Sequence, residues 1–309
     1  MLASLAESTL RQCNTCFRRW FAFCQDRNLN LFDVSVTHVL DFFVILFQEG
    51  QKYGSINSNK AALSLVLNAV IMNDPQVTRF MKGVYKLRTP QPRYTFTWDP
   101  AIVLDYLSAW YPNSDLSFER LSKKLTTLLA LITAHRVQTL SLIKLSNIKK
   151  YNEKFVINIT DQIKTSAVNR TPPTLILPYF DERPSICPAR TLEHYLSVSA
   201  TKRKSNCDSL LISFKKPFNN VTSQSLSRWI KVTLRESGID TSIFCAHSTR
   251  HAATSAANRF GVSLDIIKRT AGWTGRSETF AKFYNREVIA DTSDVFARSI
   301  CRMASVNDV

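Results

Sequence analysis

The apolar residues of this chain recur at helical spacing almost throughout, and one stretch replaces this pattern with short β-rich runs. The first helix is predicted from residue 8, with Ser8 as its N-cap. Its apolar stripe consists of Leu10, Cys13, Phe17, Trp20, Phe21 and Cys24. Further helical patterns cover about 35–49, 55–71 and 75–85. Residues 1–85 are therefore predicted to form an all-helical module.

A basic segment with prolines separates this module from the rest of the chain. Residues 86–99 contain Lys86, Arg88 and Arg93 beside Pro90 and Pro92, and they show no periodicity. Proline disfavours helical backbone in the residue before it. The segment is therefore predicted to be an extended linker, with a second domain over 100–309.

In the second domain the period changes once. Residues 147–180 contain the runs FVINIT and TLILPY between polar turns, which predicts a small antiparallel sheet. Helical patterns lie at about 100–110, 117–134, 188–200, 222–237, 248–259, 263–270, 277–284 and 288–303. The predicted fold class is mainly α: an all-helical N-terminal domain plus a mixed α+β domain with a small antiparallel sheet.

The charge of the chain indicates a polyanionic partner. Forty Lys and Arg residues against 24 Asp and Glu give a formal charge of +16 and a pI near 9.7. Such a balance favours nucleic acid as the partner. A membrane surface is the alternative, but no basic segment has a continuous apolar face, and no apolar run approaches the roughly 18 residues of a spanning helix. We expect no membrane partner.

The cysteines and the N-terminal residues bear on the compartment. Seven scattered cysteines, an odd number, favour a reducing environment over a disulfide framework. MLASLAESTLRQ lacks the layout of a signal peptide. Cys13 and Cys16 form a C-x-x-C, but without a second ligand pair they are predicted to pack in a core rather than bind zinc. The seven glycines form no phosphate-binding loop, so no cofactor is expected.

Several polar side chains stand where apolar ones are expected. They are Arg136 after the apolar run LTTLLALITA, Lys164 in DQIKTS near a hairpin turn, His247 and Arg250 in AHSTRHAATSAANRF, Trp273 in TAGWTG, and Tyr284 in FAKFYNRE. Each alone has an ordinary explanation as a helix cap, a solvated lysine or a core aromatic. The Ala, Ser and Thr residues after Arg250 would let another backbone pack closely against a helix that presents cationic donors.

In this order the six residues resemble the catalytic domain of the tyrosine recombinase, or phage-integrase-like, family. Residues 247–254 and 271–286 carry the most specific part of the resemblance, and residues 1–85 are similar to that family's helical (SAM-like) core-binding domain. Trp273 and the wording FYNR are most similar to recombinases of eukaryotic mobile elements of the DIRS and Crypton types. The resemblance implies a site-specific recombinase that acts on double-stranded DNA as a dimer to tetramer, and a nuclear location if the source is eukaryotic.

The resemblance also implies a role for each residue. Tyr284 would be the nucleophile that stores the phosphodiester energy as a 3′-phosphotyrosine. Arg136 and Arg250 would bind the non-bridging oxygens, since guanidinium forks match them. Lys164, with Lys154 as a weaker neighbour, would protonate the leaving 5′-oxygen. His247 would accept a proton or bind phosphate, Trp273 could only donate its indole N–H, and His251 would support the site. No metal is implied.

Two departures from the family pattern bear on activity. The family usually has an acidic residue three positions after the first arginine, where this chain has Thr139. The interval from Trp273 to Tyr284 is eleven residues, longer than in many relatives. Tyr284 is nevertheless the only tyrosine after H-x-x-R, whereas Tyr179 and Tyr195 fit strand or helix packing better.

Several alternatives follow from these observations. A catalytically inactive DNA-binding derivative would explain Thr139, and a type IB topoisomerase-like enzyme would share the covalent chemistry. The apolar face over 288–303 would pack on its own domain or, as the resemblance implies, on a neighbouring protomer. The predicted DNA backbone contacts are Arg18, Arg19, Lys60, Arg88 and Arg93, although each alone could be a solvated helix residue.

Overall fold

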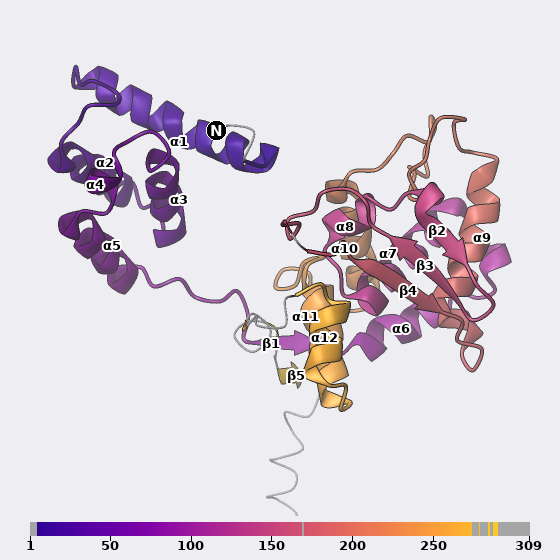
Figure 1. Ribbon diagram of the computed structural model, residues 1–309. Coiled ribbons are helices and arrows are strands. Elements are labelled where there is room, and N and C mark those ends of the chain that lie inside the picture. Colours follow the sequence, from indigo (N-terminus) through magenta and orange to yellow (C-terminus); the bar gives the residue numbers. More distant parts are fainter. Residues whose placement is uncertain (1–4, 169, 274–277, 279–283, 285–286, 290–309) are drawn as a thin grey trace, which may run out of the picture. The chain divides into compact units, whose positions relative to one another are not determined.

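The computed structural model (Figure 1) describes residues 5–168, 170–273, 278, 284 and 287–289. By its internal contacts the chain divides into two compact units, Met1–Pro92 and Arg93–Val309. None of the helices described in either unit is long and apolar enough to pass through a bilayer.

The first unit is built from helices around one apolar core. They are α1 (Glu7–Asp26), α2 (Val36–Gln48), α3 (Tyr53–Leu63), the one-turn α4 (Ala69–Met72) and α5 (Pro75–Leu87). Trp20 and Phe42 meet edge to face in this core, with their ring centroids 5.2 Å apart. Cys13 and Cys16 are buried against Ala62, so they pack in the core as predicted. The all-helical character of this part of the chain is confirmed.

Two predicted helix boundaries in the first unit are wrong. Helix α1 is preceded by Ala6 as its N-cap, so Ser8 lies inside the helix and caps nothing. The single helix expected over 55–71 is two: α3 ends at Leu63, and Asn68 opens α4 by accepting a hydrogen bond from the Val70 amide at 2.9 Å. An asparagine side chain competes with the helical backbone in this way, so it marks a new start.

In the second unit the buried helix α7 (Phe118–Thr133) is the centre of the core. Around it lie α6 (Pro100–Ser108), α8 (Val137–Ser141), α9 (Pro188–Ala200), α10 (Ser223–Glu236), α11 (Ser248–Arg259), α12 (Leu264–Thr270) and the short 3₁₀ turns η2 (Asn113–Asp115), η3 (Leu145–Asn147) and η4 (Pro184–Ile186). Helix α7 packs against α9, α10 and α11. One of its buried residues is Lys124, whose ammonium donates to the Trp110 carbonyl and, at 2.9 Å, to Asn113 Oδ1. A buried cation is tolerated here because its donors find acceptors.

A three-stranded antiparallel sheet covers part of this core (Figure 1). Its order is β2 (Ile148–Lys150), β3 (Lys154–Asn158) and β4 (Thr174–Pro178). Phe155 stands opposite Leu177, and both are buried between neighbours that are exposed or half-buried, as expected for an amphipathic strand. The predicted class, mainly α with a small antiparallel sheet, is confirmed.

A second sheet joins residues that lie far apart in the sequence. Strand β1 (Phe96–Trp98) pairs in parallel with β5 (Glu287–Ile289), with Phe96 opposite Glu287. Strand β1 falls within the predicted linker 86–99, and β5 falls where a helix over 288–303 was expected to begin. That start is wrong because the backbone there pairs with β1. Residues 290–303 lie outside the described part of the chain, as does the predicted helix 277–284 apart from Glu278 and Tyr284.

Helix α11 is the element rich in small residues, and it packs on several neighbours. It contacts α6, α7, α12, β1 and β5. The Trp98 indole N–H from β1 donates to Ser248 Oγ in its first turn at 2.9 Å, in a buried environment. Because Ala, Ser and Thr side chains are short, these neighbours can approach from several sides at once. The helix therefore gives the groups at its N-terminal end a rigid mount.

Candidate active site

The turn between α7 and α8 presents Arg136. Helix α7 ends at Thr133, and its C-cap Ala134 has a left-handed backbone, with φ 49° and ψ 21°. This conformation is costly for a residue with a Cβ. Here a hydrogen bond from another helix stabilises it, because the Ala134 carbonyl accepts from Arg250 Nη1 at 2.7 Å. Arg136 is then the N-cap of α8, half-buried. The two predicted arginines are thus brought to the same turn.

Arg250 carries a buried guanidinium, and part of its hydrogen-bonding capacity is unused among the described residues. The residue is 1% exposed, and its Nε and Nη2 have no acceptor among the described residues. Its Cζ lies 4.2 Å from the centroid of the Trp273 ring and 5.4 Å from that of Tyr284. Burial and the charge of Arg136 lower the pKa of Arg250 to about 10, against the opposing effect of Tyr284. Buried cationic donors without acceptors are what an anion-binding site requires.

The hydroxyl of Tyr284 is within hydrogen-bond distance of His247, beside Arg250. Tyr284 Oη and His247 Nε2 are 2.9 Å apart, and the histidine tautomer decides which one donates. The phenol ring stacks on His251, with centroids 4.1 Å apart and planes inclined by 15°. Ser255 Oγ donates to the backbone carbonyl of Tyr284. Tyr284 is therefore positioned by α11 both through its ring and through its backbone.

His247 reports the electrostatics of the site. Partial burial of its ring, followed by the positive charges of Arg250, Arg136 and Lys164, lowers the pKa of His247 to about 4. The residue as a whole is exposed, but its ring is affected by the charges of three cationic side chains. At neutral pH the imidazole is uncharged and can accept a proton.

Lys164 adds a further positive charge that acts on His247, from the connection between two strands. It lies exposed in the long connection between β3 and β4, as the hairpin interpretation predicted. Lys154, the weaker alternative, is exposed at the start of β3 opposite Pro178. The charge of Lys164 is one of those that lower the pKa of His247. This is consistent with the prediction that Lys164, rather than Lys154, serves the site.

Sequence reasoning missed His135, which stands between the two arginines. It is 5% exposed, and burial, then Arg250 and Arg136, lower its pKa to about 4. The Thr270 backbone accepts a hydrogen bond from it. Its ring covers Gly272, since a Cβ at that glycine would stand 3.0 Å from His135 Cε1. Only its place directly before Arg136 could have drawn attention to it.

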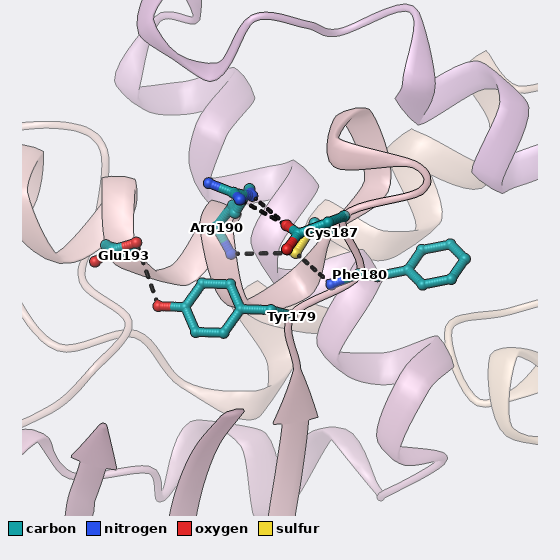
Figure 2. Close-up of polar contacts among 6 residues, drawn as sticks. Tyr179, Phe180, Cys187, Arg190 and Glu193 are labelled. Carbon is teal, nitrogen blue, oxygen red and sulfur yellow. Dashed lines mark hydrogen bonds and ion pairs between the residues drawn. The ribbon is translucent and has the colours of Figure 1, made fainter. Parts of the chain in front are cut away.

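The competing tyrosines have structural partners elsewhere, as expected. Figure 2 shows the Tyr179 hydroxyl reaching Glu193, with 3.3 Å between the oxygens. Tyr195 is fully buried and its oxygen accepts a hydrogen bond from the Ile212 amide. Burial raises the pKa of both phenols, and the Glu193 carboxylate raises that of Tyr179 further. Both are therefore poorer nucleophiles than an ordinary phenol.

Of the predicted DNA contacts, three arginines are engaged inside their own unit. Arg88 donates to the Gln51 carbonyl at 2.6 Å and covers the Phe47 ring. Arg19 pairs with Glu49 at 3.3 Å, and Arg93 donates to the Ser242 carbonyl at 2.9 Å. Arg18 is exposed and Lys60 is half-buried. Within the described residues, no group of three or more His, Cys, Asp or Glu could hold a metal ion.

Comparison with known proteins agrees with this architecture. The sequence profile described as "Phage integrase family" matches residues 109–288. No curated protein sequence matches the chain. A lambda integrase dimer bound to a COC′ core site is similar in structure, with a TM-score of 0.56 at 15% identity over 92% of this chain and 90% of that chain.

Two further solved structures are similar. XerH recombinase bound to difH substrate has a TM-score of 0.55 at 12% identity, over 88% of this chain and 70% of that chain. The Tn1549 transposon integrase in complex with circular intermediate DNA has a TM-score of 0.54 at 13% identity, over 86% and 85%. At these identities the likeness concerns the fold, and the profile match, which covers more than half of the chain, concerns the family. The chain belongs to the phage integrase family, that of the tyrosine recombinases.

Proposed function

We propose that this chain is a site-specific DNA recombinase that cuts and rejoins strands through a covalent 3′-phosphotyrosine at Tyr284. The single observation that carries the proposal is the hydrogen bond of 2.9 Å between Tyr284 and His247, beside the buried guanidinium of Arg250. A phenol next to a neutral imidazole and unpaired cationic donors is suited to attack a phosphodiester.

In the proposed reaction one bond to phosphorus forms as another breaks, and two side chains move the protons. Tyr284 Oη forms a bond to phosphorus while the bond from phosphorus to the 5′-oxygen breaks. His247, with its own proton on Nδ1, takes the phenolic proton at Nε2. Lys164 gives a proton to the leaving 5′-oxygen. In the rejoining step a 5′-hydroxyl attacks the phosphotyrosine, and the protons return by the same route.

The two arginines supply the charge stabilisation. As negative charge grows on the non-bridging oxygens, Arg136 and the free Nε and Nη2 of Arg250 would bind them. One arginine contributes roughly 10³–10⁵ in rate in other phosphoryl transfers. Two guanidiniums and the ammonium of Lys164 are therefore enough charge for a mechanism that needs no metal ion.

The partner in this proposal is double-stranded DNA, bound by a homo-oligomer. The formal charge of +16 supports a polyanionic partner. Relatives of the same fold have been solved as a dimer on a core site and as a tetramer on a Holliday junction. We extend the proposal to a mobile element of the DIRS or Crypton type, on the wording around Trp273 and FYNR, and to nuclear action in a eukaryotic source.

A nicked suicide substrate tests the proposal. Wild-type protein should form a covalent adduct, because the cut strand loses the 5′-hydroxyl needed for rejoining. Tyr284→Phe should form none, whereas the matched control Tyr179→Phe should react as wild type does, since that hydroxyl serves Glu193. Adduct formation by Tyr284→Phe would refute the assigned nucleophile.

One observation favours a second candidate, a DNA-binding derivative that has lost catalysis. Thr139 occupies the family's acidic position, and it is 2% exposed within α8. Binding without any adduct from wild type would identify this alternative. Relaxation of supercoiled DNA by a monomer would instead indicate topoisomerase-like chemistry.

A further inference from the structure

The connection between β3 and β4 is anchored by polar contacts on the side of Asp161. This carboxylate pairs with Lys144 at 2.9 Å, and the neighbouring Thr160 accepts a hydrogen bond from Asn147 at 3.0 Å. Both contacts precede Lys164 in the sequence. They fix where the connection leaves the sheet, but not where its far part lies relative to Tyr284.

A cavity of about 770 Å³ occupies the space beyond Lys164. It is lined by the far part of this connection, by the end of α7 and by α12 with the turn after it, including Ser166, Arg170, Lys268 and Trp273. Among the described residues, this cavity lies between much of the Lys164 connection and the Trp273 turn. Where fewer side chains interlock, individual hydrogen bonds matter more.

Arg170 makes such a bond. Its Nη2 donates to the backbone carbonyl of Gly272 at 2.8 Å, and the side chain is only half-buried. This links the Lys164 connection to the residue that directly precedes Trp273. The contact spans 102 positions of the sequence, so no local structure imposes it.

The acceptor is itself fixed to the site on two sides. Gly272 has a φ of +67° and carries the His135 ring against its Cα, directly beside Arg136 in the sequence. Trp273 packs on Tyr284, with ring centroids 4.7 Å apart, and under the guanidinium of Arg250. The Gly272 carbonyl is thus a point of the site to which a loop can be attached.

We infer that Arg170 is a positioning residue for the leaving-group side of the reaction: its bond to the Gly272 carbonyl holds the Lys164 connection against the Trp273 turn, so that the Lys164 ammonium reaches the 5′-oxygen. The inference rests on the proposed strand-exchange function. Arg170 acts through Lys164 and does not itself move a proton. The charge of Lys164 acts on His247 and lowers the pKa of that imidazole, which is consistent with such placement.

The expected loss of rate on substitution of Arg170 follows from the proposed role of Lys164 as general acid. General-acid protonation contributes about 10²–10⁴ in rate, and a displacement of about 1 Å can cost about 10²-fold. Arg170→Met removes the donor while keeping the length of the side chain. Cleavage of an ordinary phosphodiester should therefore slow by about 10- to 100-fold, while the folded chain and its DNA affinity stay close to those of wild type.

A substrate that needs no general acid separates positioning from mere structural damage. In a 5′-bridging phosphorothiolate the leaving atom is sulfur, which departs without a proton. On nicked suicide DNA of both kinds we would measure the rate of adduct formation for wild type, Arg170→Met, Arg170→Lys and the control Arg183→Met. Arg183 is another arginine of this unit, and it pairs with Asp105 at 3.0 Å.

The supporting result is slower adduct formation by Arg170→Met on the ordinary substrate and a wild-type rate on the phosphorothiolate. Arg170→Lys should recover part of the rate on the ordinary substrate, and Arg183→Met should react at the wild-type rate on both. An equal deficit on both substrates would overturn the inference, because Arg170 would then act on phosphate or on folding. Wild-type rates on both would overturn it as well. No adduct from wild type on either substrate would instead refute the proposed function, and the inference with it.

Discussion

Gly272 offers the sharpest test of how the site is held together, because a single methyl group meets two constraints there. Its φ of +67° disfavours any residue with a Cβ, and the added carbon would stand 3.0 Å from His135 Cε1 and 3.7 Å from both ring nitrogens. A second glycine provides a matched control. Gly261 has a φ of +80° in the same unit, but a Cβ added there would meet nothing within 4 Å.

The two constraints can be given magnitudes. Left-handed backbone costs a non-glycine residue roughly 1–2 kcal/mol, and this applies to both Gly261→Ala and Gly272→Ala. Only the latter adds overpacking against the buried His135, for which a further cost of about 1–2 kcal/mol is reasonable because the ring must shift by a few tenths of an ångström. For a domain of this size, that difference corresponds to roughly 2–8 °C in Tm.

The assay is unfolding by heat and urea, followed by tryptophan fluorescence. Of the five tryptophans, only Trp20 lies in the first unit, so the signal reports mainly on the second. Gly272→Ala should unfold before Gly261→Ala. It should also slow adduct formation by about 10- to 100-fold, since the displaced ring neighbours Arg136, whereas Gly261→Ala should react as wild type does.

A double variant shows whether the imidazole is the cause. His135→Ala removes the ring and makes room for the new methyl group. The stability lost in His135→Ala plus Gly272→Ala should therefore be smaller than the sum of the single losses by about 1 kcal/mol. Equal stability of Gly272→Ala and Gly261→Ala, or strictly additive losses in the double variant, would refute the reasoning.

Three further predictions concern the core and the site. Burial lowers the pKa of Lys124 from 10.5 to about 8. Between pH 8 and pH 10.5 the unfolded chain therefore binds more protons than the folded protein, so the free energy of unfolding rises with pH. Relative to Lys124→Met, wild type should gain about 3 kcal/mol of stability over that interval in urea titrations. Trp98→Phe loses the buried hydrogen bond to Ser248 and should lower the free energy of unfolding by about 1 kcal/mol in the same titrations; an unchanged value would contradict this. Arg250→Lys keeps the charge but not the fork, so adduct formation should fall at least about 10³-fold while the salt dependence of DNA binding stays unchanged; a smaller loss would mean that charge alone suffices.

The elements that could be predicted from the sequence are those whose signals are local. Helices α7, α9 and α11 were expected within about one residue of their observed ends, because the sequence signals of a helix, such as the apolar periodicity of α7, lie in adjacent residues. The pairing of β1 with β5 was not, since three-residue strands carry little pattern and their partners lie about 190 positions apart. Parallel pairing of this kind is decided by tertiary contacts alone.

The residues of the candidate site also fall into those that could be predicted from the sequence and those that could not. Arg136, Lys164, His247, Arg250, Trp273 and Tyr284 were named because their order resembles the tyrosine recombinase family. The structure brings His247, Arg250, Trp273 and Tyr284 into contact, and the charges of Arg136 and Lys164 act on His247. His135 and Arg170 were not named, because their importance lies in a contact with Gly272 that is remote in sequence. The left-handed Ala134 was likewise invisible, since its conformation depends on the hydrogen bond from Arg250.

In the proposed mechanism, the charges of the site would also keep Tyr284 unreactive until DNA binds. In the free protein, Arg250, Arg136 and Lys164 all lower the pKa of His247, and a histidine with a pKa of about 4 is a weak proton acceptor for Tyr284. A bound phosphate would offset those cations, and further negative charge on its oxygens would offset them more, so the pKa of His247 would rise as the reaction advances. The same guanidiniums that bind the phosphate would thereby stop suppressing the base, and proton transfer would become favourable only in the complex with DNA.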